Sequence, residues 1–267
     1  MARFVIDAPH ERDNIIDWIK NYFIANGSAE TKAVIGISGG KDSTIAAALL
    51  CRALGPERVV AVLMPDGEQK DIDDSYAICY ALNLPAENIW TINIAEAVNA
   101  CVGVMMGYSN DAIMTNTPAR IRMIMLYQVA AVVGGRVCNT GNASELYVGY
   151  TTKYGDLAGD FSLFRNYYVR DVIAIGMTMP EVPEYLVIKT PGDGMSGSTD
   201  EERFGFTYET LDAFLIDKVT PDYLVQREIE RRHNINTHKR CISLPAPGLC
   251  SRHEEDKEWH PEPKFWF

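Results

Sequence analysis

The residues from Gly36 to Ser43 read Gly-Ile-Ser-Gly-Gly-Lys-Asp-Ser, and their types and order are suited to holding a polyanion. Backbone amides of a glycine-rich turn can converge on an anion, and a following helix adds the positive end of its dipole. Ser38 and Ser43 add hydroxyl donors, and Lys41 adds a positive charge. Asp42 is a carboxylate among groups that attract anions, which makes sense if a Mg²⁺ ion lies between it and bound phosphates.

The spacing of this loop excludes two common nucleotide-binding motifs. In a Walker A loop four residues separate the glycines and Lys is followed by Ser or Thr, but here three residues separate Gly36 from Gly40, and Asp42 follows Lys41. The loop does not read G-x-G-x-x-G either. The bland alternative is a tight strand-to-helix turn with capping serines. The S-G-G-x-D-S order instead resembles the signature of the ATP pyrophosphatases, which cleave ATP between its α and β phosphates.

Apolar runs and helical periodicity alternate along the chain and indicate the elements that position this loop. Buried strands are predicted at residues 33–37, 58–64, 88–94 and 136–140. Helices are predicted at residues 14–24, 43–54, 71–83, 117–133, 168–178, 207–217 and 220–232. Strands that are apolar throughout and separated by helices indicate a parallel sheet covered on both faces. The predicted fold is α/β, a doubly wound parallel sheet with helices on both faces.

Length and charge set limits on the class of protein. The chain has 267 residues and a net charge of −11. We expect residues 1–267 to form one domain, with an irregular tail from about residue 241. Residues 141–166 and 189–205 lack periodicity and are predicted to be long functional loops. The acidic balance argues against a nucleic-acid partner, and no apolar run is long enough to span a membrane.

The cysteines favour a cytoplasmic protein. They lie at positions 51, 79, 101, 138, 241 and 250, without a C-x-x-C pair, and four of them lie in apolar runs. We interpret them as reduced core thiols. The amino end has no apolar core of a signal peptide. The spacing of Cys241, Cys250, His253 and His260 in the tail does not fit the usual zinc sites.

Six further segments, in order, resemble the ammonia-dependent NAD synthetases, and the resemblance runs from about residue 10 to Arg240. They are Met64–Asp74, Asn116–Arg122, Asn139–Glu145, Gly149–Asp156 followed by Asp160, Asp200–Asp212, and His238–Arg240. The resemblance implies the ATP pyrophosphatase fold, which is similar to that of the adenine nucleotide alpha hydrolases, and an enzyme that forms C–N bonds. It also implies Mg²⁺ as cofactor, ATP as co-substrate and a homodimer.

The reaction that the resemblance implies joins ammonia to a carboxylate. The nicotinate carboxylate of deamido-NAD attacks the α-phosphate of ATP, pyrophosphate leaves, and ammonia then displaces AMP to give NAD. ATP is needed because a carboxylate is a poor acyl donor until one oxygen belongs to a good leaving group. Bringing two polyanions together requires metal ions and aimed cationic groups.

The resemblance also implies roles for single residues. The ATP-binding residues would be Gly36, Ile37, Ser38, Gly39, Gly40, Lys41, Asp42, Ser43, Gln69 and Thr140. The residues that bind deamido-NAD would be Arg120, Lys153, Asp160, His238 and Lys239, and Arg122 is expected on a different helix face from Arg120. Asp42 and Glu145 would hold Mg²⁺, and Asp42, Lys41 and Asp160 would be catalytic. An aspartate near the ammonium entry could deprotonate it, and the sequence leaves Asp156 and Asp160 as alternatives.

Two departures from the family pattern keep other functions open. Val169 stands where many members have Lys facing ATP, and Gly192 stands where many have Thr or Ser. A catalytically silent module that binds ATP and a dinucleotide is therefore one alternative. Another ATP pyrophosphatase, which amidates or thiolates a different substrate, is a second. Ammonia is the expected nitrogen donor because no glutaminase nucleophile is recognised among the cysteines.

Overall fold

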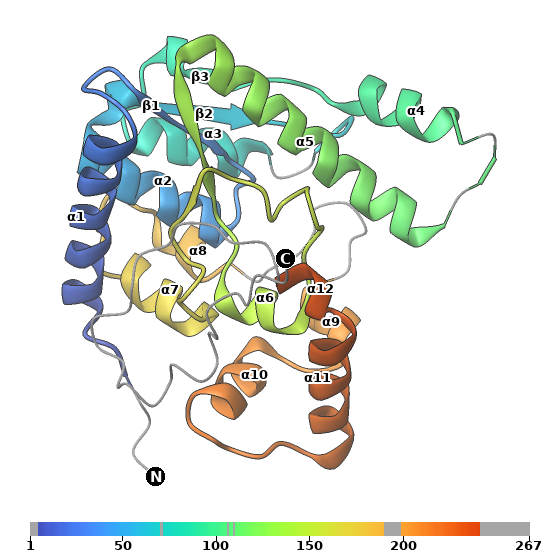
Figure 1. The fold of residues 1–267 in the computed structure, drawn as a ribbon. Helices are drawn as coiled ribbons and strands as arrows, with labels where there is room; N and C mark the ends of the chain where they lie inside the picture. Colours follow the sequence, from blue (N-terminus) through green and yellow to red (C-terminus); the bar gives the residue numbers. More distant parts are fainter. Residues whose placement is uncertain (1–4, 70–71, 106, 109, 190–198, 241–267) are drawn as a thin grey trace.

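A five-stranded parallel sheet forms the centre of the molecule (Figure 1), in the order β3-β2-β1-β4-β5. The computed structural model describes residues 5–69, 72–105, 107–108, 110–189 and 199–240. The strands are Lys32–Gly36 (β1), Val59–Leu63 (β2), Ile89–Thr91 (β3), Gly135–Asn139 (β4) and Phe161–Ser162 (β5). The chain runs from β1 outward to one edge and then returns to β4, so β1 and β4 adjoin at the switch point. The predicted doubly wound sheet is confirmed.

Helices cover both faces of the sheet and extend beyond one end of it. Those against the sheet are α1 (Ala8–Asn26), α2 (Lys41–Leu54), α3 (Ile72–Ala81), α4 (Ala95–Gly103), α5 (Asp111–Val133), α7 (Val169–Gly176) and α8 (Glu184–Val187). Those toward the other end of the molecule are α6 (Ala143–Val148), α9 (Asp200–Phe204), α10 (Tyr208–Leu215), α11 (Tyr223–Ile235) and α12 (Thr237–Arg240). Short 3-10 helices at Pro56–Arg58 and Ala86–Asn88 precede β2 and β3.

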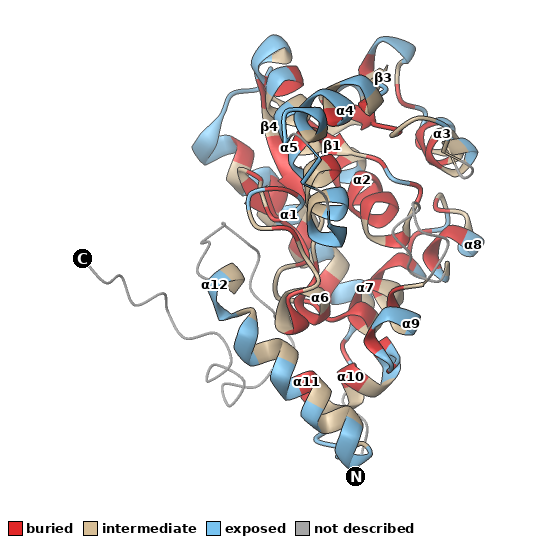
Figure 2. Cartoon of the chain, turned by 90° about the vertical axis from the view of Figure 1, so that its right-hand side faces the viewer, coloured by how far each residue is buried: buried red, intermediate tan, exposed pale blue. Residues whose placement is uncertain are grey.

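Alternate residues of the inner strands enter two different cores. Ala33 and Ile35 of β1 pack with residues of α1, α2 and α7, whereas Val34 packs with residues of α4 and α5. Figure 2 shows buried residues concentrated along the strands and α2. A third core joins α6, α9, α10 and α11 around Phe204 and Leu211. Because side chains of a strand alternate between faces, a sheet covered on both sides must be apolar throughout, as the sequence indicates.

Four sequence predictions differ from the structure. The predicted loop at residues 189–205 contains α9, which is only five residues long. The predicted loop at residues 141–166 contains α6 and β5, which are too short to give a periodic signal. Helix α4 was not predicted. Helix α5 begins at Asp111 and not at residue 117, because the side chain of Asn110 accepts a hydrogen bond from the Ile113 amide and caps the helix six residues earlier.

The cysteine interpretation is corrected at one position. Cys79 and Cys138 are buried and Cys51 is half-buried, but Cys101 is exposed and is not a core thiol. Among the described residues, no helix has the length and apolar character needed to cross a membrane. The predicted tail from about residue 241, with its cysteines and histidines, lies outside the described residues, as does Gly192.

Candidate active site

The glycine loop connects β1 to α2 at the carboxyl edge of the sheet. The Ile37 amide donates to the Val62 carbonyl at 3.0 Å, so strand pairing continues into the loop. Gly39 has a φ of +76°, in the left-handed region that favours glycine. A Cβ there would lie 3.0 Å from the Asp74 Cβ, so the loop packs directly against the first turn of α3. Glycine is therefore required at position 39 by both backbone conformation and space.

Two serine hydroxyls hold the shape of the loop. The Ser38 amide donates to Ser43 Oγ at 3.3 Å, and the two hydroxyl oxygens are 3.1 Å apart. The Gly40 amide donates to Ser38 Oγ at 3.2 Å, and Ser43 Oγ donates to the Gly40 carbonyl at 3.1 Å. Gly40 is the N-cap of α2 and has no side chain that could cap it, so the first amides of α2 face no capping group. The turn is thus fixed while its amides can bind an anion.

Lys41 is a buried cation among carboxylates. Its side chain is 2% exposed, and its Nζ lies 2.8 Å from Asp42 Oδ2 and 5.7 Å from the centre of the Tyr208 ring. Burial lowers the pKa of Lys41, but the surrounding carboxylates, Asp42 and Glu145 above all, raise it by more than burial lowers it. The pKa of Lys41 is therefore above its usual value. Lys41 therefore carries its positive charge at neutral pH.

Asp42 and Glu145 approach each other from α2 and α6. Asn142 joins them: its side-chain amide donates to Asp42 Oδ1 at 3.3 Å, and its backbone amide donates to Glu145 Oε2 at 3.2 Å. Asn142 and Glu145 also form a capping box that starts α6. Burial first, and the charge of Asp42 second, raise the pKa of Glu145. A cation placed between the two carboxylates would favour the charged form of Glu145.

The donor set at this place fits Mg²⁺ bound together with phosphates. Mg²⁺ is usually held by one or two carboxylates, with water and phosphate oxygens completing its coordination. Asp42 and Glu145 supply two carboxylates beside the glycine loop. Across the described part of the chain, no group of three or more His, Cys, Asp or Glu residues could hold a metal ion by itself. The site therefore suits a metal that arrives with a nucleotide.

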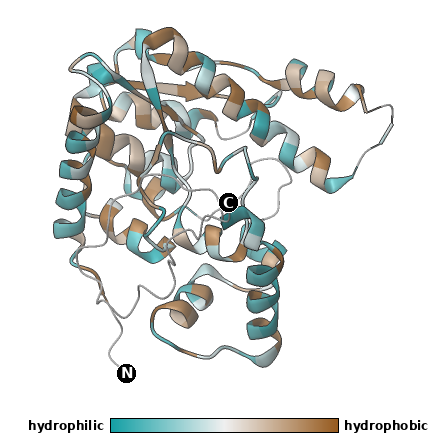
Figure 3. Cartoon of the chain, viewed as in Figure 1, coloured by the Kyte–Doolittle hydropathy of each residue, from teal (hydrophilic) through white to brown (hydrophobic). Residues whose placement is uncertain are grey.

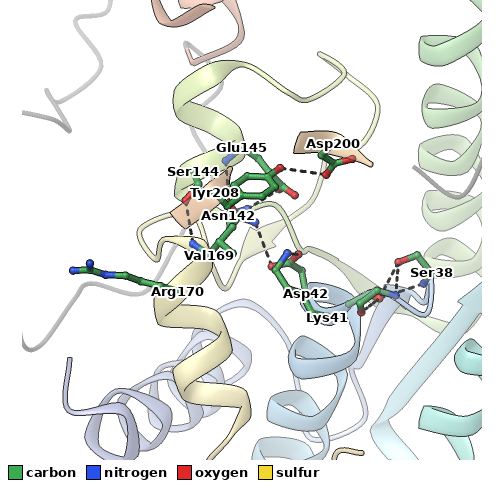
Figure 4. Close-up of polar contacts among 12 residues, drawn as sticks. Ser38, Lys41, Asp42, Asn142, Ser144, Glu145, Val169, Arg170, Asp200 and Tyr208 are labelled. Carbon is green, nitrogen blue, oxygen red and sulfur yellow. Dashed lines mark hydrogen bonds and ion pairs between the residues drawn. The ribbon is translucent and has the colours of Figure 1, made fainter. Parts of the chain in front are cut away.

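Tyr208 and Asp200 belong to the same cluster, although sequence reasoning assigned them no role (Figure 4). The Tyr208 hydroxyl donates to Asp200 Oδ2 at 3.2 Å while its ring covers the Lys41 ammonium. Both side chains are buried. Their segment carries part of the family pattern, but spacing along the chain does not reveal that the start of α10 faces the start of α2. The contact with Lys41 is a product of the tertiary fold.

Val169 lies at the start of α7, where a buried polar network orients the helix. The Val169 amide donates to Ser144 Oγ at 3.0 Å, and Ser144 Oγ donates to Asp212 Oδ1 at 2.6 Å. Asp212 Oδ2 accepts from the Arg170 amide at 2.9 Å. Burial raises the pKa of Asp212 to about 6. The Arg170 guanidinium makes two hydrogen bonds to Asp217, at 2.6 and 3.0 Å, and a cavity of about 280 Å³ lies between this network and Lys41.

A second group of cations lies around α12. Arg120 Nε donates to the Lys153 carbonyl at 3.3 Å, and Lys153 Nζ donates to the His238 carbonyl at 2.9 Å. Lys239 Nζ donates to the carbonyls of Gly149 and Thr151 at 2.7 and 2.6 Å. The structure thus brings together Arg120, Lys153, His238 and Lys239, while their contact with deamido-NAD stays a prediction. Asp160 does not join these contacts.

Asp160 directly precedes β5, and its side chain contacts the middle of β4. Its Oδ2 accepts from the Val137 amide at 2.7 Å, and its carbonyl accepts from the Tyr22 hydroxyl at 3.1 Å. Arg122 Nε donates to the Met64 carbonyl at 3.1 Å, whereas Arg120 is exposed. The predicted separation of the two arginines onto different helix faces is confirmed, and the catalytic and binding roles of Asp160 stay predictions.

Gln69 and Thr140 follow β2 and β4, respectively, and both are half-buried. Their position at the carboxyl edge of the sheet is where α/β proteins bind ligands. Their contact with ATP stays a prediction. Fold and site together define an α/β protein with an anion-binding loop and a carboxylate pair at the switch point of its sheet.

Comparison with known proteins gives the family. The sequence model described as NAD synthase matches residues 11–243, and the chain belongs to this family. It is 37% identical over 220 residues to the NH3-dependent NAD+ synthetase of Thermoplasma acidophilum, covering 79% of this chain and 88% of the relative. It is 34% identical over 246 residues to that of Alkaliphilus metalliredigens, covering 89% and 97%.

Solved structures give the same fold. The NMN synthetase of Francisella tularensis superposes with a TM-score of 0.82 and 30% identity, covering 90% of this chain and 98% of that one. The NH3-dependent NAD synthetase of Campylobacter jejuni superposes with a TM-score of 0.70 and 28% identity, covering 88% and 96%. The predicted family and fold are confirmed.

Proposed function

We propose that this chain is an ammonia-dependent NAD synthetase, which amidates deamido-NAD and converts ATP to AMP and pyrophosphate. The observation that carries the proposal is the meeting of Lys41, Asp42 and Glu145 beside the glycine loop, at the carboxyl edge of the sheet. Family membership supports the same activity. A silent binding module is not favoured. Burying a lysine among carboxylates costs free energy, and buried charged groups of this kind cluster at sites that perform chemistry.

The pyrophosphate end of ATP lies against the glycine loop and the start of α2 in this proposal. The loop amides, Ser38 and Lys41 stabilise the charge that develops on the leaving pyrophosphate. Asp42 and Glu145 would hold Mg²⁺, which would neutralise phosphate charge and polarise a phosphoryl oxygen. Gln69 and Thr140, at the ends of β2 and β4, contact the rest of the nucleotide.

The reaction balances as two displacements. A nicotinate oxygen forms a bond to the α-phosphorus, the bond from that phosphorus to the bridging oxygen breaks, and pyrophosphate leaves. Ammonia then attacks the acyl carbon, loses a proton, and the bond to the phosphate oxygen breaks, so AMP leaves with one former carboxylate oxygen. Either Asp156 or Asp160 is proposed to take a proton from ammonium, because a carboxylate can act as a general base. Asp156 lies beside Lys239 and Arg122, whereas Asp160 accepts from the Val137 amide.

Arg120, Lys153, His238 and Lys239 bind deamido-NAD in this proposal. Lys153 and Lys239 donate to backbone carbonyls. A phosphate is a stronger acceptor than a neutral carbonyl, so the ammonium groups can turn to the substrate. His238 is exposed and Thr151 is half-buried, so water can replace the lysine at these two carbonyls, whereas Gly149 is buried.

Nicotinate mononucleotide is a second candidate substrate. The solved NMN synthetase of Francisella tularensis has a higher TM-score to this chain than the Campylobacter NAD synthetase, 0.82 against 0.70. The same carboxylate would be activated and amidated, and only the adenylate half of the dinucleotide would be missing. The two substrates differ in the groups that the cations must bind beyond the nicotinate, because only deamido-NAD carries the adenylate half.

One assay tests both candidates. The purified chain receives ATP, Mg²⁺ and ammonium with either deamido-NAD or nicotinate mononucleotide, and NAD or NMN is quantified together with AMP and pyrophosphate. We expect NAD formation with one AMP and one pyrophosphate for each turnover, and a higher kcat/KM for deamido-NAD. A higher kcat/KM for the mononucleotide favours the second candidate, and ADP formed in step with product contradicts both. Ammonium-free glutamine in place of ammonium should give no product.

The chain is also proposed to act as a homodimer in the cytoplasm. Figure 3 shows hydrophobic residues along α4 and α5. Those that are exposed here form the α4–α5 surface, which consists of Val104, Met105, Met114, Ile124 and Val132. A surface of this kind is typical of a protein interface. We expect light scattering to report a dimer for the native chain and a monomer for Val132→Asp. The control Val219→Asp, exposed elsewhere, should stay dimeric.

A further inference from the structure

Three segments that are far apart in the sequence meet behind the glycine loop. Lys189 follows α8, Asp74 lies in the first turn of α3, and Gly39 is at the centre of the loop. Lys189 Nζ lies 2.6 Å from Asp74 Oδ2 and 3.4 Å from the Gly39 carbonyl oxygen. One ammonium group thus binds both the loop and the helix against which the loop packs.

The loop has little room to move relative to α3. A Cβ on Gly39 would lie 3.0 Å from the Asp74 Cβ and 3.2 Å from the Ser75 amide nitrogen. Ser75 is buried, and the Lys189 and Asp74 side chains are 29% and 25% exposed. The ion pair between them is therefore partly shielded from water, and a displacement of α3 would be passed on to the loop.

The contact of Lys189 with the Gly39 carbonyl also fixes the orientation of the Gly39–Gly40 peptide. In a trans peptide the C=O and the following N–H point to opposite sides. With the Gly39 carbonyl directed at Lys189, the Gly40 N–H points away from Lys189, to the side where Ser38 Oγ accepts from it at 3.2 Å. That side carries the amides and hydroxyls of the loop.

We propose that Lys189 is a positioning residue of the pyrophosphate site, which acts by holding the Gly39–Gly40 peptide and α3 in the orientation that directs the uncapped first amides of α2 at pyrophosphate. The inference rests on the proposed role of the loop in binding the pyrophosphate of ATP. Direct contact between Lys189 and phosphate is the competing explanation, because Lys189 lines the same cavity as Lys41. Positioning is favoured because its ammonium reaches the loop from the carbonyl side and is already paired with Asp74.

A double-mutant cycle separates these explanations. Lys189→Met, Asp74→Asn and the double variant are compared with the native chain by calorimetric titration with magnesium pyrophosphate, and by the KM values for ATP and the amidated substrate. We expect each single variant to bind pyrophosphate about tenfold more weakly, the scale of one lost charge-assisted hydrogen bond. The double variant should be no weaker, Lys189→Arg should restore most of the affinity, and the KM of the other substrate should not change.

Arg52 and Glu181 provide a matched control. They form an ion pair that joins α2 to the segment before α8, with side chains 30% and 28% exposed, and the pair lies away from the glycine loop, at the other end of α2. Arg52→Met should lower thermal stability about as much as Lys189→Met and leave pyrophosphate affinity unchanged. This control shows whether loss of a bridging ion pair is enough to weaken binding.

Each outcome decides one point. Native affinity in Lys189→Met, or an equal loss of affinity in Arg52→Met, overturns the positioning role. Weak binding in Lys189→Met with native binding in Asp74→Asn also overturns it, in favour of a direct phosphate contact. If the native chain fails to bind pyrophosphate, the proposed ATP site itself is wrong, whereas native binding with unaffected variants removes only the role of Lys189.

Discussion

The two ends of the site are built in different ways. At the proposed pyrophosphate end, consecutive residues of one turn supply the amides, the hydroxyls, Lys41 and Asp42, and Glu145 completes the set from α6, which follows the neighbouring strand β4. At the dinucleotide end, Lys153 and Lys239 come from segments that are distant in the sequence and donate to carbonyls of one another's segments. The first end pairs charge with charge, and the second pairs charge with neutral backbone groups.

The difference between the two ends matches what each end must do in the proposed reaction. The pyrophosphate end carries the developing charge of a leaving group, so its groups must be in place before reaction. The dinucleotide end only has to bind, and cations on neutral carbonyls can be transferred to a phosphate without exposing a buried carboxylate. Substitutions at the first end should therefore change turnover, and those at the second end should change substrate affinity.

The largest effect is expected for the carboxylate pair. Asp42→Ala and Glu145→Ala should each lower kcat by at least about a hundredfold, because the remaining carboxylate cannot hold the metal beside the phosphates. Circular dichroism and thermal melting should show a retained fold. Asp17→Ala, on the surface of α1, is the control and should keep native kcat. Near-native turnover of either site variant at saturating Mg²⁺ would remove its role as metal ligand.

An intermediate effect is expected at the dinucleotide end. Lys239→Met should raise the KM for the amidated substrate about 10- to 100-fold, the scale of a lost hydrogen bond between a charged group and a phosphate, with little change in the KM for ATP. Lys218→Met is a matched control, because Lys218 Nζ also donates to a backbone carbonyl, that of Leu215, at 3.0 Å. An equal change in both KM values would show that the two ends are not separate.

A smaller effect is expected from Asp212, which orients α7 and Ser144. Its pKa in the folded chain is raised to about 6 from 3.8, so between these values the folded state binds more protons than the unfolded state. The contribution of this carboxyl to stability is therefore fully present below about pH 3.8 and is lost as the pH rises through about 6. Asp212→Asn removes this dependence.

Denaturant unfolding of the native chain and of Asp212→Asn measures this contribution. Relative to the variant, the native chain should lose about 1 kcal/mol of unfolding free energy between about pH 5 and about pH 7. A constant difference between the two proteins across this range would contradict the raised pKa. The measurement also tests the support of the carboxylate pair, because Ser144, which donates to Asp212, directly precedes Glu145.

The sequence predicts the sheet well because its signal is local. Each inner strand is a run of apolar residues, and both faces of the sheet are covered. Helix α6 escaped prediction because six residues give no periodicity, although Asn142 and Glu145 carry the spacing of a capping box. The start of α5 depends on the cap at Asn110, which lies ahead of the apolar stretch.

The site is only partly predictable, because only part of its signal is local in the sequence. The glycine loop is contiguous, so its chemistry can be reasoned from its residues. The pairing of Asn142 with Asp42 joins positions 100 residues apart, and the cover of Lys41 by Tyr208 depends on how α10 packs. Glu145, Lys153 and Lys239 were recognised by family resemblance, because a single Glu or Lys has no local pattern that distinguishes a ligand from a surface charge.

The central claim is that a carboxylate is activated by attack on the α-phosphate of ATP, and isotope transfer tests it most directly. Deamido-NAD with both carboxylate oxygens labelled with ¹⁸O is converted by the purified chain with ATP, Mg²⁺ and ammonium, and the products are analysed by mass spectrometry. The account predicts one labelled oxygen in AMP, one in the amide of NAD, and none in pyrophosphate. Unlabelled AMP, or label in inorganic phosphate formed together with ADP, would contradict it.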